Sequence, residues 1–155
     1  MAQMGFGTPL IIAHENDAWS ERVKLFKDVD QLGSINKKSP LYLMAKSLMA
    51  QKPTVRFFKV GTRAKGESIE TALQAIINED GDFYGVLLVN IHGDDAEGYI
   101  KDVESLAKAV SGKRLLAGVD ITEQHLAIAE KLKAEKCRNV FFTYSLMSII
   151  THQQP

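Results

Sequence analysis

The chain has 155 residues, 45% of them hydrophobic, which is enough for the core of one ordinary domain. Its 19 basic and 19 acidic residues cancel, so its net charge would attract neither nucleic acid nor an anionic membrane. The single cysteine, Cys137, cannot form an internal disulfide, which fits a reducing compartment at assembly. The start MAQMGFGTPLII lacks the pattern of an export signal, and no apolar run approaches the ~20 residues of a membrane span. The composition therefore predicts a soluble protein.

The first third of the chain predicts two strands and one helix. A short apolar run typical of a buried strand is PLIIA (9–13), and RVKLF (22–26) alternates like an edge strand. Ser39 and Pro40 then have the order of a helix cap followed by proline at the first helical position. One face of this helix is apolar: Leu41, Met44, Ala45, Leu48 and Met49.

The middle of the chain predicts a strand, a helix and a second strand. The β-rich run TVRFFKV (54–60) ends at Gly61, and Ser68 caps the next helix. A turn at residues 80–81 leads into FYGVLLVNI (83–91), whose continuous apolar character predicts a strand covered on both faces. The apolar face of the helix consists of Ile69, Ala72, Leu73, Ile76 and Ile77.

The last third continues the alternation. A helix is expected at about 96–110, closed by Gly112, and the strand RLLAGV (114–119) follows it. A helix at 122–136 and the strand NVFFTY (139–144) complete the pattern. Strands that alternate with such helices imply β-α-β crossovers. The sequence therefore predicts one α/β domain over residues 1–155, with a mainly parallel or mixed central sheet and helices on both faces.

Residues 58–68, FKVGTRAKGES, have the glycine spacing of a phosphate-binding P-loop. They also lie between a predicted strand and a predicted helix, as such a loop does. The position after the second glycine should carry the lysine that neutralises the β- and γ-phosphates, but it carries Glu67, whose charge repels phosphate. Lys65 stands two places too early. We therefore expect that these residues bind no nucleotide.

Polar residues follow the strand at 83–91, at the carboxyl end where sites form in parallel sheets. Asn90, His92, Asp94 and Asp95 lie there, and Asp120 ends the next strand. Their oxygen and nitrogen atoms could bind a divalent ion. However, Asp94, Asp95 and Asp120 also stand just before predicted helices, where a carboxylate caps free N–H groups. We expect caps, with no metal bridged among them.

A pocket like that of a receiver or phosphohydrolase domain is a further hypothesis. Its members would be His14, Glu15 and Asp17 at the end of the first strand, joined by Asp95 or Asp120. Such a pocket needs a lysine or a hydroxyl nearby, and the hydroxyls at a strand end are those of Thr143 and Ser145. We do not expect this pocket to be functional.

The remaining candidates favour packing over chemistry. His125 shares a helical face with Ile121, Ile128 and Leu132, which predicts a packed histidine. Core positions are likewise expected for Phe57, Phe58, Phe141 and Phe142. We expect no catalytic, cofactor-binding or metal-binding residue, and no enzyme. The open alternative is a small α/β metal-dependent enzyme or ligand-binding domain that uses His14, Asn90, Asp94, Asp95 and Asp120.

An ordered series of motifs in residues 5–63 resembles the tail sheath proteins of contractile-tailed bacteriophages and prophages. The series begins with FGTPLII, continues with SERV and the helix start DVD, and ends with SPLYLMAKSLMAQ and RFFKVGTR. The remainder of the chain resembles the family more loosely. Members of this family are several hundred residues long. The resemblance therefore implies that the chain is an α/β domain of a longer sheath protein.

The resemblance also implies a function by assembly. Sheath subunits stack as rings around an inner tube, and sheath contraction drives the tube through the host envelope. The implied partners are other sheath subunits and the tail tube protein, with no nucleic acid and no membrane insertion. The implied location is the virion tail, after assembly in the bacterial cytoplasm, and the family contributes no catalytic residue.

The apolar run LMSII (146–150) near the end of the chain has no assigned place in the predicted fold. Such a run either packs on its own domain or contacts a neighbour. The resemblance places it where the assembly part of a sheath protein begins. We accordingly expect the isolated chain to be a monomer or a weak oligomer.

Overall fold

The computed structural model describes residues 8–14, 19–32, 37–50, 56–92, 94–135 and 139–144, without the side chains of residues 141, 143 and 144. The strands are β1 (Pro9–His14), β2 (Val23–Phe26), β3 (Phe58–Arg63), β4 (Gly85–Leu88), β5 (Leu116–Ile121) and β6 (Val140–Tyr144). The helices are α1 (Pro40–Met49), α2 (Ile69–Glu79), α3 (Ala96–Val110) and α4 (Leu126–Ala134), with short 3-10 helices η2 (Val29–Leu32) and η3 (Glu123–His125).

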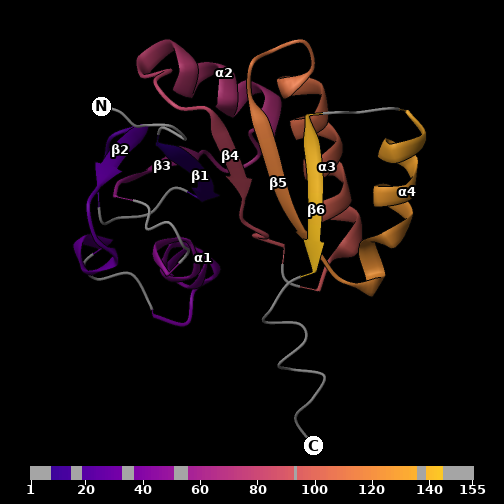
Figure 1. The fold of residues 1–155 in the computed structure, drawn as a ribbon, viewed down its shortest axis with the longest axis horizontal. Coiled ribbons are helices and arrows are strands. Elements are labelled where there is room, and N and C mark those ends of the chain that lie inside the picture. The colour runs from indigo at the N-terminus through magenta and orange to yellow at the C-terminus, as the bar shows by residue number, and fades with distance from the viewer. Residues whose placement is uncertain are drawn as a thin grey trace, which may run out of the picture.

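The strands form one sheet in the order β2-β3-β1-β4-β5-β6 (Figure 1). β2 is antiparallel to β3, and each of the other neighbouring pairs is parallel. Apart from β2 at the edge, this is the doubly wound order in which β1 lies between two strands that follow it in the chain. The predicted α/β class with a mainly parallel sheet is confirmed.

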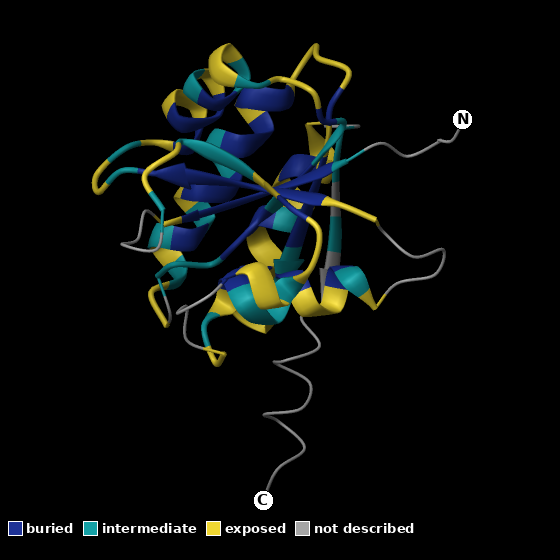
Figure 2. Ribbon diagram, turned by 90° about the vertical axis from the view of Figure 1, so that its left-hand side faces the viewer, coloured by how far each residue is buried: buried dark blue, intermediate teal, exposed yellow. Residues whose placement is uncertain are grey.

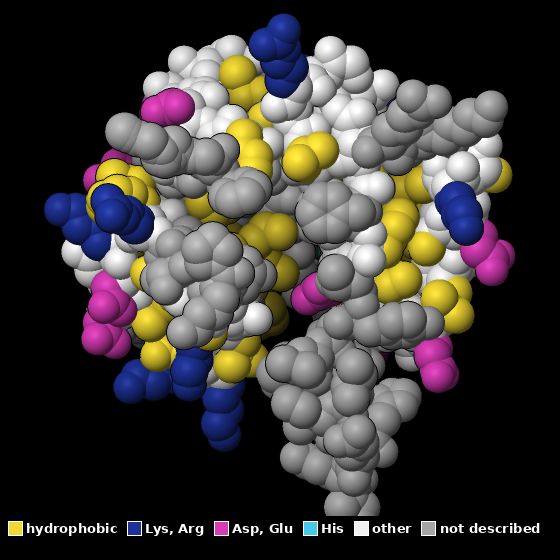
Figure 3. All heavy atoms as spheres, in the orientation of Figure 1, with side chains coloured by type: hydrophobic (Ala, Val, Ile, Leu, Met, Phe, Trp, Pro, Cys, Tyr) yellow, Lys and Arg dark blue, Asp and Glu magenta, His cyan; other side chains and the backbone are white. Residues whose placement is uncertain are grey.

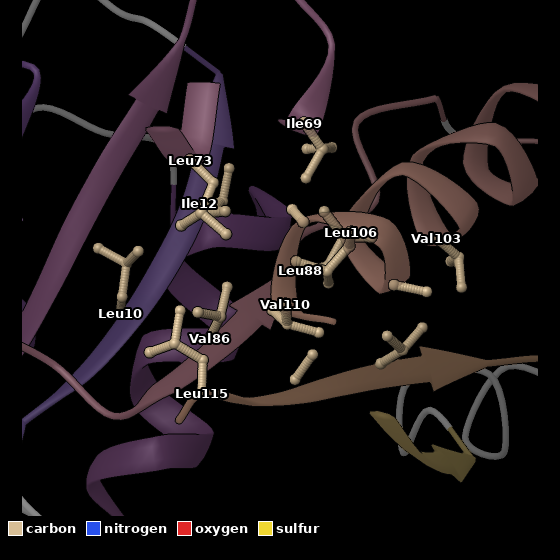
Figure 4. Close-up of a cluster of buried hydrophobic side chains, with 14 of the residues drawn as sticks. Leu10, Ile12, Ile69, Leu73, Val86, Leu88, Val103, Leu106, Val110 and Leu115 are labelled. Atoms are coloured by element: carbon tan, nitrogen blue, oxygen red, sulfur yellow. The ribbon is translucent and has the colours of Figure 1, made fainter. Parts of the chain in front are cut away.

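Helices cover both faces of the sheet. On one face, α1 and η2 pack on a cluster that includes Ile11, Phe58 and Val60. On the other face, α2, α3 and α4 enclose the larger cluster, part of which is drawn in Figure 4. Figure 2 shows the buried strands between these two helical layers. Among the described helices, none is long and apolar enough to cross a membrane.

Several element bounds differ from the sequence-based expectations. β3 does not end at Gly61, because Thr62 and Arg63 continue its pairing with β1. β5 runs two residues further than expected, because Asp120 and Ile121 pair with β6. β4 is shorter than the apolar run 83–91, and the predicted helix 122–136 is divided into η3 and α4. Apolar periodicity does not predict η2, which begins at Val29, inside the DVD segment (28–30).

Two of the predicted helix caps are confirmed by hydrogen bonds. The Ser39 hydroxyl accepts from the Tyr42 N–H at 3.3 Å, with Pro40 at the first helical position. The Ser68 hydroxyl accepts from the Thr71 N–H at 3.1 Å. Both serines have extended backbone angles, as N-cap residues do. These short polar signals fix where α1 and α2 begin.

Gly61 lies in the middle of β3, where α2 packs closely on the strand. Its partners in the sheet are Ile12 and Val23, so it is a strand residue rather than a loop residue. A Cβ atom at this position would collide with Ile76 Cδ1 and come within 3.3 Å of Leu10 Cδ1. The glycine is therefore explained by the packing of α2 against β3.

We predict that Gly61→Ala lowers the free energy of unfolding by about 1–3 kcal/mol through overpacking. Adding Ile76→Val removes the colliding Cδ1 atom and should recover part of the loss. Gly85→Ala is a matched control, because a Cβ there meets only the Leu116 carbonyl oxygen at 3.9 Å. Urea denaturation of the unchanged protein and the three variants measures these effects. Equal losses for the two single glycine variants would contradict the packing explanation.

Candidate functional site

The loop after β3 does not have the form of a P-loop. Its first glycine would have to open the loop, but Gly61 is inside the strand, and the loop comprises only residues 64–67 before the cap Ser68. Gly66 has φ of +80°, a conformation that side chains disfavour. The Glu67 carboxylate accepts from the Ala64 N–H at 3.1 Å and so closes the loop on itself. The second glycine of the apparent motif thus serves a tight turn.

Glu67 is held by an arginine from the edge of the sheet. Arg22, just before β2, donates from Nη1 to Glu67 Oε1 at 2.5 Å and from Nη2 to Oε2 at 3.1 Å. This two-point contact is the main reason why the pKa of Glu67 is below its ordinary value. Arg22 Nη1 also donates to the Thr62 carbonyl oxygen at 3.1 Å. Glu67, which stands where a P-loop has its lysine, therefore joins the loop to the residue that precedes β2.

A buried ion pair lies at the carboxyl end of β3. Arg63 Nη1 donates to Asp102 Oδ2 of α3 at 2.6 Å, and the two side chains are 8% and 9% exposed. Arg63 Nη2 donates to the Glu67 carbonyl oxygen at 2.7 Å. Removing one partner of such a pair leaves a buried charge uncompensated, which is more costly than the net gain of the pair. The pair therefore holds β3, its loop and α3 in one arrangement.

His92 completes this arrangement from the segment after β4. Its Nε2 lies 2.8 Å from Asp102 Oδ2, the same oxygen that Arg63 contacts. Its backbone N–H donates to Asn90 Oδ1 at 2.9 Å. A Cβ at Gly98 of α3 would lie 2.5 Å from His92 Nδ1. The helix therefore needs glycine at 98 for the imidazole to lie against it.

We call Arg22, Glu67, Arg63, Asp102 and His92 the strand-end network. Arg22 lies just before β2, Arg63 at the end of β3, and Asp102 in α3, while Glu67 and His92 lie in the segments that follow β3 and β4. In the order given, basic and acidic side chains alternate. A carboxylate beside a histidine can orient the ring for proton transfer. Here the carboxylate holds Nε2, and the other ring nitrogen lies against the α3 backbone at Gly98. The geometry therefore suits positioning of loops better than acid–base chemistry.

A second group of buried polar residues lies between α3 and the end of β5. The Tyr99 hydroxyl donates to the Asp120 carbonyl oxygen at 2.6 Å, and the Tyr99 and His125 rings are 4.7 Å apart. Burial raises the pKa of Tyr99 above its ordinary value. The Thr122 N–H donates to His125 Nδ1 at 3.1 Å, so that nitrogen is an acceptor and is unprotonated. His125 is 3% exposed, which confirms the predicted packed histidine.

The expected capping role is confirmed for one of the three aspartates. Asp95 Oδ1 accepts from the Gly98 N–H at 3.2 Å and is the N-cap of α3. Asp94 is exposed and lies one residue before that cap. The prediction for Asp120 was wrong, because Asp120 lies within β5 and Thr122 is the N-cap residue of η3. The pairing of β5 with β6 places Asp120 inside the sheet instead.

The other predicted site residues are not brought into one described site. His14 is exposed at the end of β1. Glu15, Asp17, Cys137 and Ser145 lie outside the described residues, as does the Thr143 side chain. Within the described part of the chain, no three His, Cys, Asp or Glu side chains are placed to hold a metal ion. Among the phenylalanines, Phe58 is buried as expected, whereas Phe57, just before β3, is 37% exposed.

The sequence reasoning missed Arg22, Arg63 and Asp102. Asp102 follows Tyr99 by three residues and precedes Leu106 by four, so it shares the buried face of α3. A carboxylate on an apolar helical face indicates a buried partner, and this spacing was the available signal. No sequence pattern identified Arg63 as the partner of Asp102, because the two residues are 39 positions apart.

Comparisons with protein families, with characterised proteins and with solved structures found no match to the chain.

We predict that Asp102→Ala lowers the free energy of unfolding by about 3–5 kcal/mol, because it leaves the buried Arg63 without its counter-ion. Glu104→Ala is the matched control on the same helix. It removes the exposed ion pair between Lys131 Nζ and Glu104 Oε2, which are 3.0 Å apart, and should lower the free energy of unfolding by about 0–1 kcal/mol. Urea denaturation measures both. Similar losses from the two variants would show that the buried pair does not hold α3 to the sheet.

We predict that His125 makes the fold less stable as the pH falls. Burial lowers the pKa of His125, so below about pH 6.5 the unfolded chain binds a proton that the folded chain resists. The free energy of unfolding should fall by up to about 1.4 kcal/mol per pH unit from this group. His125→Phe should flatten the dependence between pH 7.5 and 5.5, whereas Gln124→Phe, at an exposed neighbour, should not. An unchanged slope in His125→Phe would refute the assignment.

Proposed function

We propose that the chain is a structural α/β domain of a contractile phage tail sheath, the assembly that surrounds the tail tube and contracts to drive it through the host envelope. The observation that carries the proposal is the ordered series of motifs over residues 5–63, from FGTPLII to RFFKVGTR. Its partners in this proposal are other sheath subunits and the tail tube protein, and it acts without a cofactor. It is assembled in the bacterial cytoplasm and located in the virion tail.

The contacts of the KVGTR motif support a structural role for the residues that carry the resemblance. Lys59 is 7% exposed, and its Nζ lies 2.8 Å from both Asp80 Oδ2 and the Asp82 carbonyl oxygen. Gly61 admits the close packing of α2, and Arg63 forms the ion pair with α3. The motif therefore consists of residues that join β3 to the elements around it, as expected for a domain that transmits force.

The alternative, a small α/β metal-dependent enzyme or ligand-binding domain, has one observation in its favour. His92 and Asp102 form a histidine–carboxylate pair at the carboxyl edge of the sheet, where α/β enzymes bind their ligands. Against it, Asp95 is engaged as a helix cap, and His92 Nδ1 faces the backbone at Gly98. The structural role accounts for more of these contacts.

Purified particles provide the test of the proposed function. Contractile tails or phage particles from the source strain would be separated on a density gradient and analysed by mass spectrometry. Peptides of this chain should occur in the tail fraction at copy numbers similar to those of the tube protein, and antibodies against the chain should label the outside of extended tails. Recovery only in the soluble cell fraction would contradict the proposal and favour the enzyme.

We predict that Glu67→Lys, which gives residues 61–68 the complete P-loop sequence motif, does not create nucleotide binding, because Gly61 remains inside β3. The variant should instead be less stable than the unchanged protein, since the introduced ammonium group would face the Arg22 guanidinium. Calorimetry with ATP and Mg²⁺ and a thermal melt measure the two effects. Micromolar ATP affinity, in either protein, would overturn the structural explanation of the loop.

A further inference from the structure

β2 lies at one edge of the sheet. It pairs with β3 on one side, and no described strand lies on its other side. Figure 1 shows β2 at the left-hand edge, and Figure 3, in the same orientation, shows hydrophobic and basic side chains there. The outer side of an edge strand presents backbone N–H and C=O groups that can pair with another chain. An edge that stays open therefore favours association through β2.

The pairing of β2 with β3 determines which backbone groups point outward. The Thr62 N–H donates to the Arg22 carbonyl oxygen at 2.8 Å, so these two residues are a hydrogen-bonded pair of the ladder. Hydrogen-bonded and non-hydrogen-bonded pairs alternate along an antiparallel ladder. The N–H groups of Val23 and Leu25, and that of Lys27 just after the strand, therefore point away from β3 and toward the outer edge.

Two of these three outward N–H groups are held by side chains of the same chain. The Val23 N–H donates to Oε2 of Glu79, the last residue of α2, at 3.2 Å. The Lys27 N–H donates to Oε1 of Gln31, in η2, at 2.6 Å. Leu25 lies between these two positions, and it is 49% exposed. The carboxylate and the amide thus occupy backbone donors on both sides of an exposed leucine.

A second copy of the chain that pairs with β2 along its length would need the same donors. Two β2 strands can pair antiparallel about a two-fold axis at Leu25, with the two leucines opposite each other. In that register, Val23 of each copy forms a hydrogen-bonded pair with Lys27 of the other. Their N–H groups are the two that the carboxylate and the amide already hold. The two copies cannot complete this ladder while both side chains stay in place.

We propose that Glu79 and Gln31 close the edge of β2 against pairing with β2 of a second copy. The side chains at this edge favour such pairing once the donors are released. The two half-exposed Leu25 side chains would cover each other, and each Lys24 would lie opposite Phe26 rather than opposite another lysine. The edge is therefore a latent contact surface for a second copy. This inference does not depend on the proposed function.

Analytical ultracentrifugation of the full chain tests the proposal. Glu79→Ala combined with Gln31→Ala releases both N–H groups, and this double variant should dimerise at least about 10-fold more tightly than the unchanged protein. Glu70→Ala combined with Gln74→Ala is the matched control, because it removes the same two residue types from exposed positions of α2. The control should sediment like the unchanged protein.

Leu25→Pro, added to the double variant, tests whether the copies associate through β2. Proline removes the N–H at the centre of the paired β2 strands and leaves the hydrogen bonds to β3, which use Lys24 and Phe26. The association should then be lost. If circular dichroism shows that the proline impairs folding, Leu25→Lys provides the same test, because it places two ammonium groups opposite each other in the paired strands.

Amide hydrogen exchange of the unchanged protein tests the contacts without a substitution. The N–H groups of Val23 and Lys27 should exchange at least about 10-fold more slowly than that of Leu25 between them. Equal exchange rates would overturn the proposal. It is also overturned if the double variant dimerises no more tightly than the control, or if its association persists with Leu25→Pro and Leu25→Lys.

Discussion

The buried contact between Arg63 and Asp102 constrains the carboxyl edge of the sheet. Both side chains are more than nine-tenths buried, so neither can lose its partner without leaving a charge in a poorly solvated place. That requirement sets the distance from β3 to α3. It also explains why the neighbouring groups are arranged as they are: His92 uses the same carboxylate oxygen, and the Glu67 carbonyl takes the second arginine nitrogen.

Small residues make these polar contacts compatible with a close-packed fold. Gly61 lets α2 lie directly on β3, and Gly98 lets the His92 ring lie on α3. At each position a methyl group would displace a side chain that the fold depends on. The loop 64–67 between β3 and α2 is then short and closed by Glu67, whose carboxylate joins it to the edge of the sheet through Arg22. Packing and electrostatics thus act on the same few segments.

These constraints bear on the proposed role in a contractile sheath. A subunit that transmits force has to keep its strands and helices in register under load. The strand-end network ties β2, β3 and α3 together, while Lys59 ties the opposite end of β3 to the turn after α2. The segment on which the sheath proposal rests, residues 5–63, ends with β3, which contacts both the strand-end network and the turn after α2. The same carboxyl edge is where an enzyme of this class would bind a ligand, and the His92–Asp102 pair at that edge is the contact on which the enzyme hypothesis rests.

The sequence by itself determined the fold class and the approximate place of every described strand and α-helix. Apolar periodicity and short capping signals such as Ser39-Pro40 and Ser68 act over a few residues and are readable without tertiary structure. The charge of Glu67 likewise predicted, from the sequence alone, that residues 58–68 do not bind a nucleotide phosphate. The sequence did not reveal that Gly61 lies inside the strand, that Asp120 is paired within the sheet, or that Arg63, Asp102 and His92 meet. Those facts depend on which strands become neighbours, and the contacts that decide this join residues tens of positions apart, so only the tertiary structure could supply them.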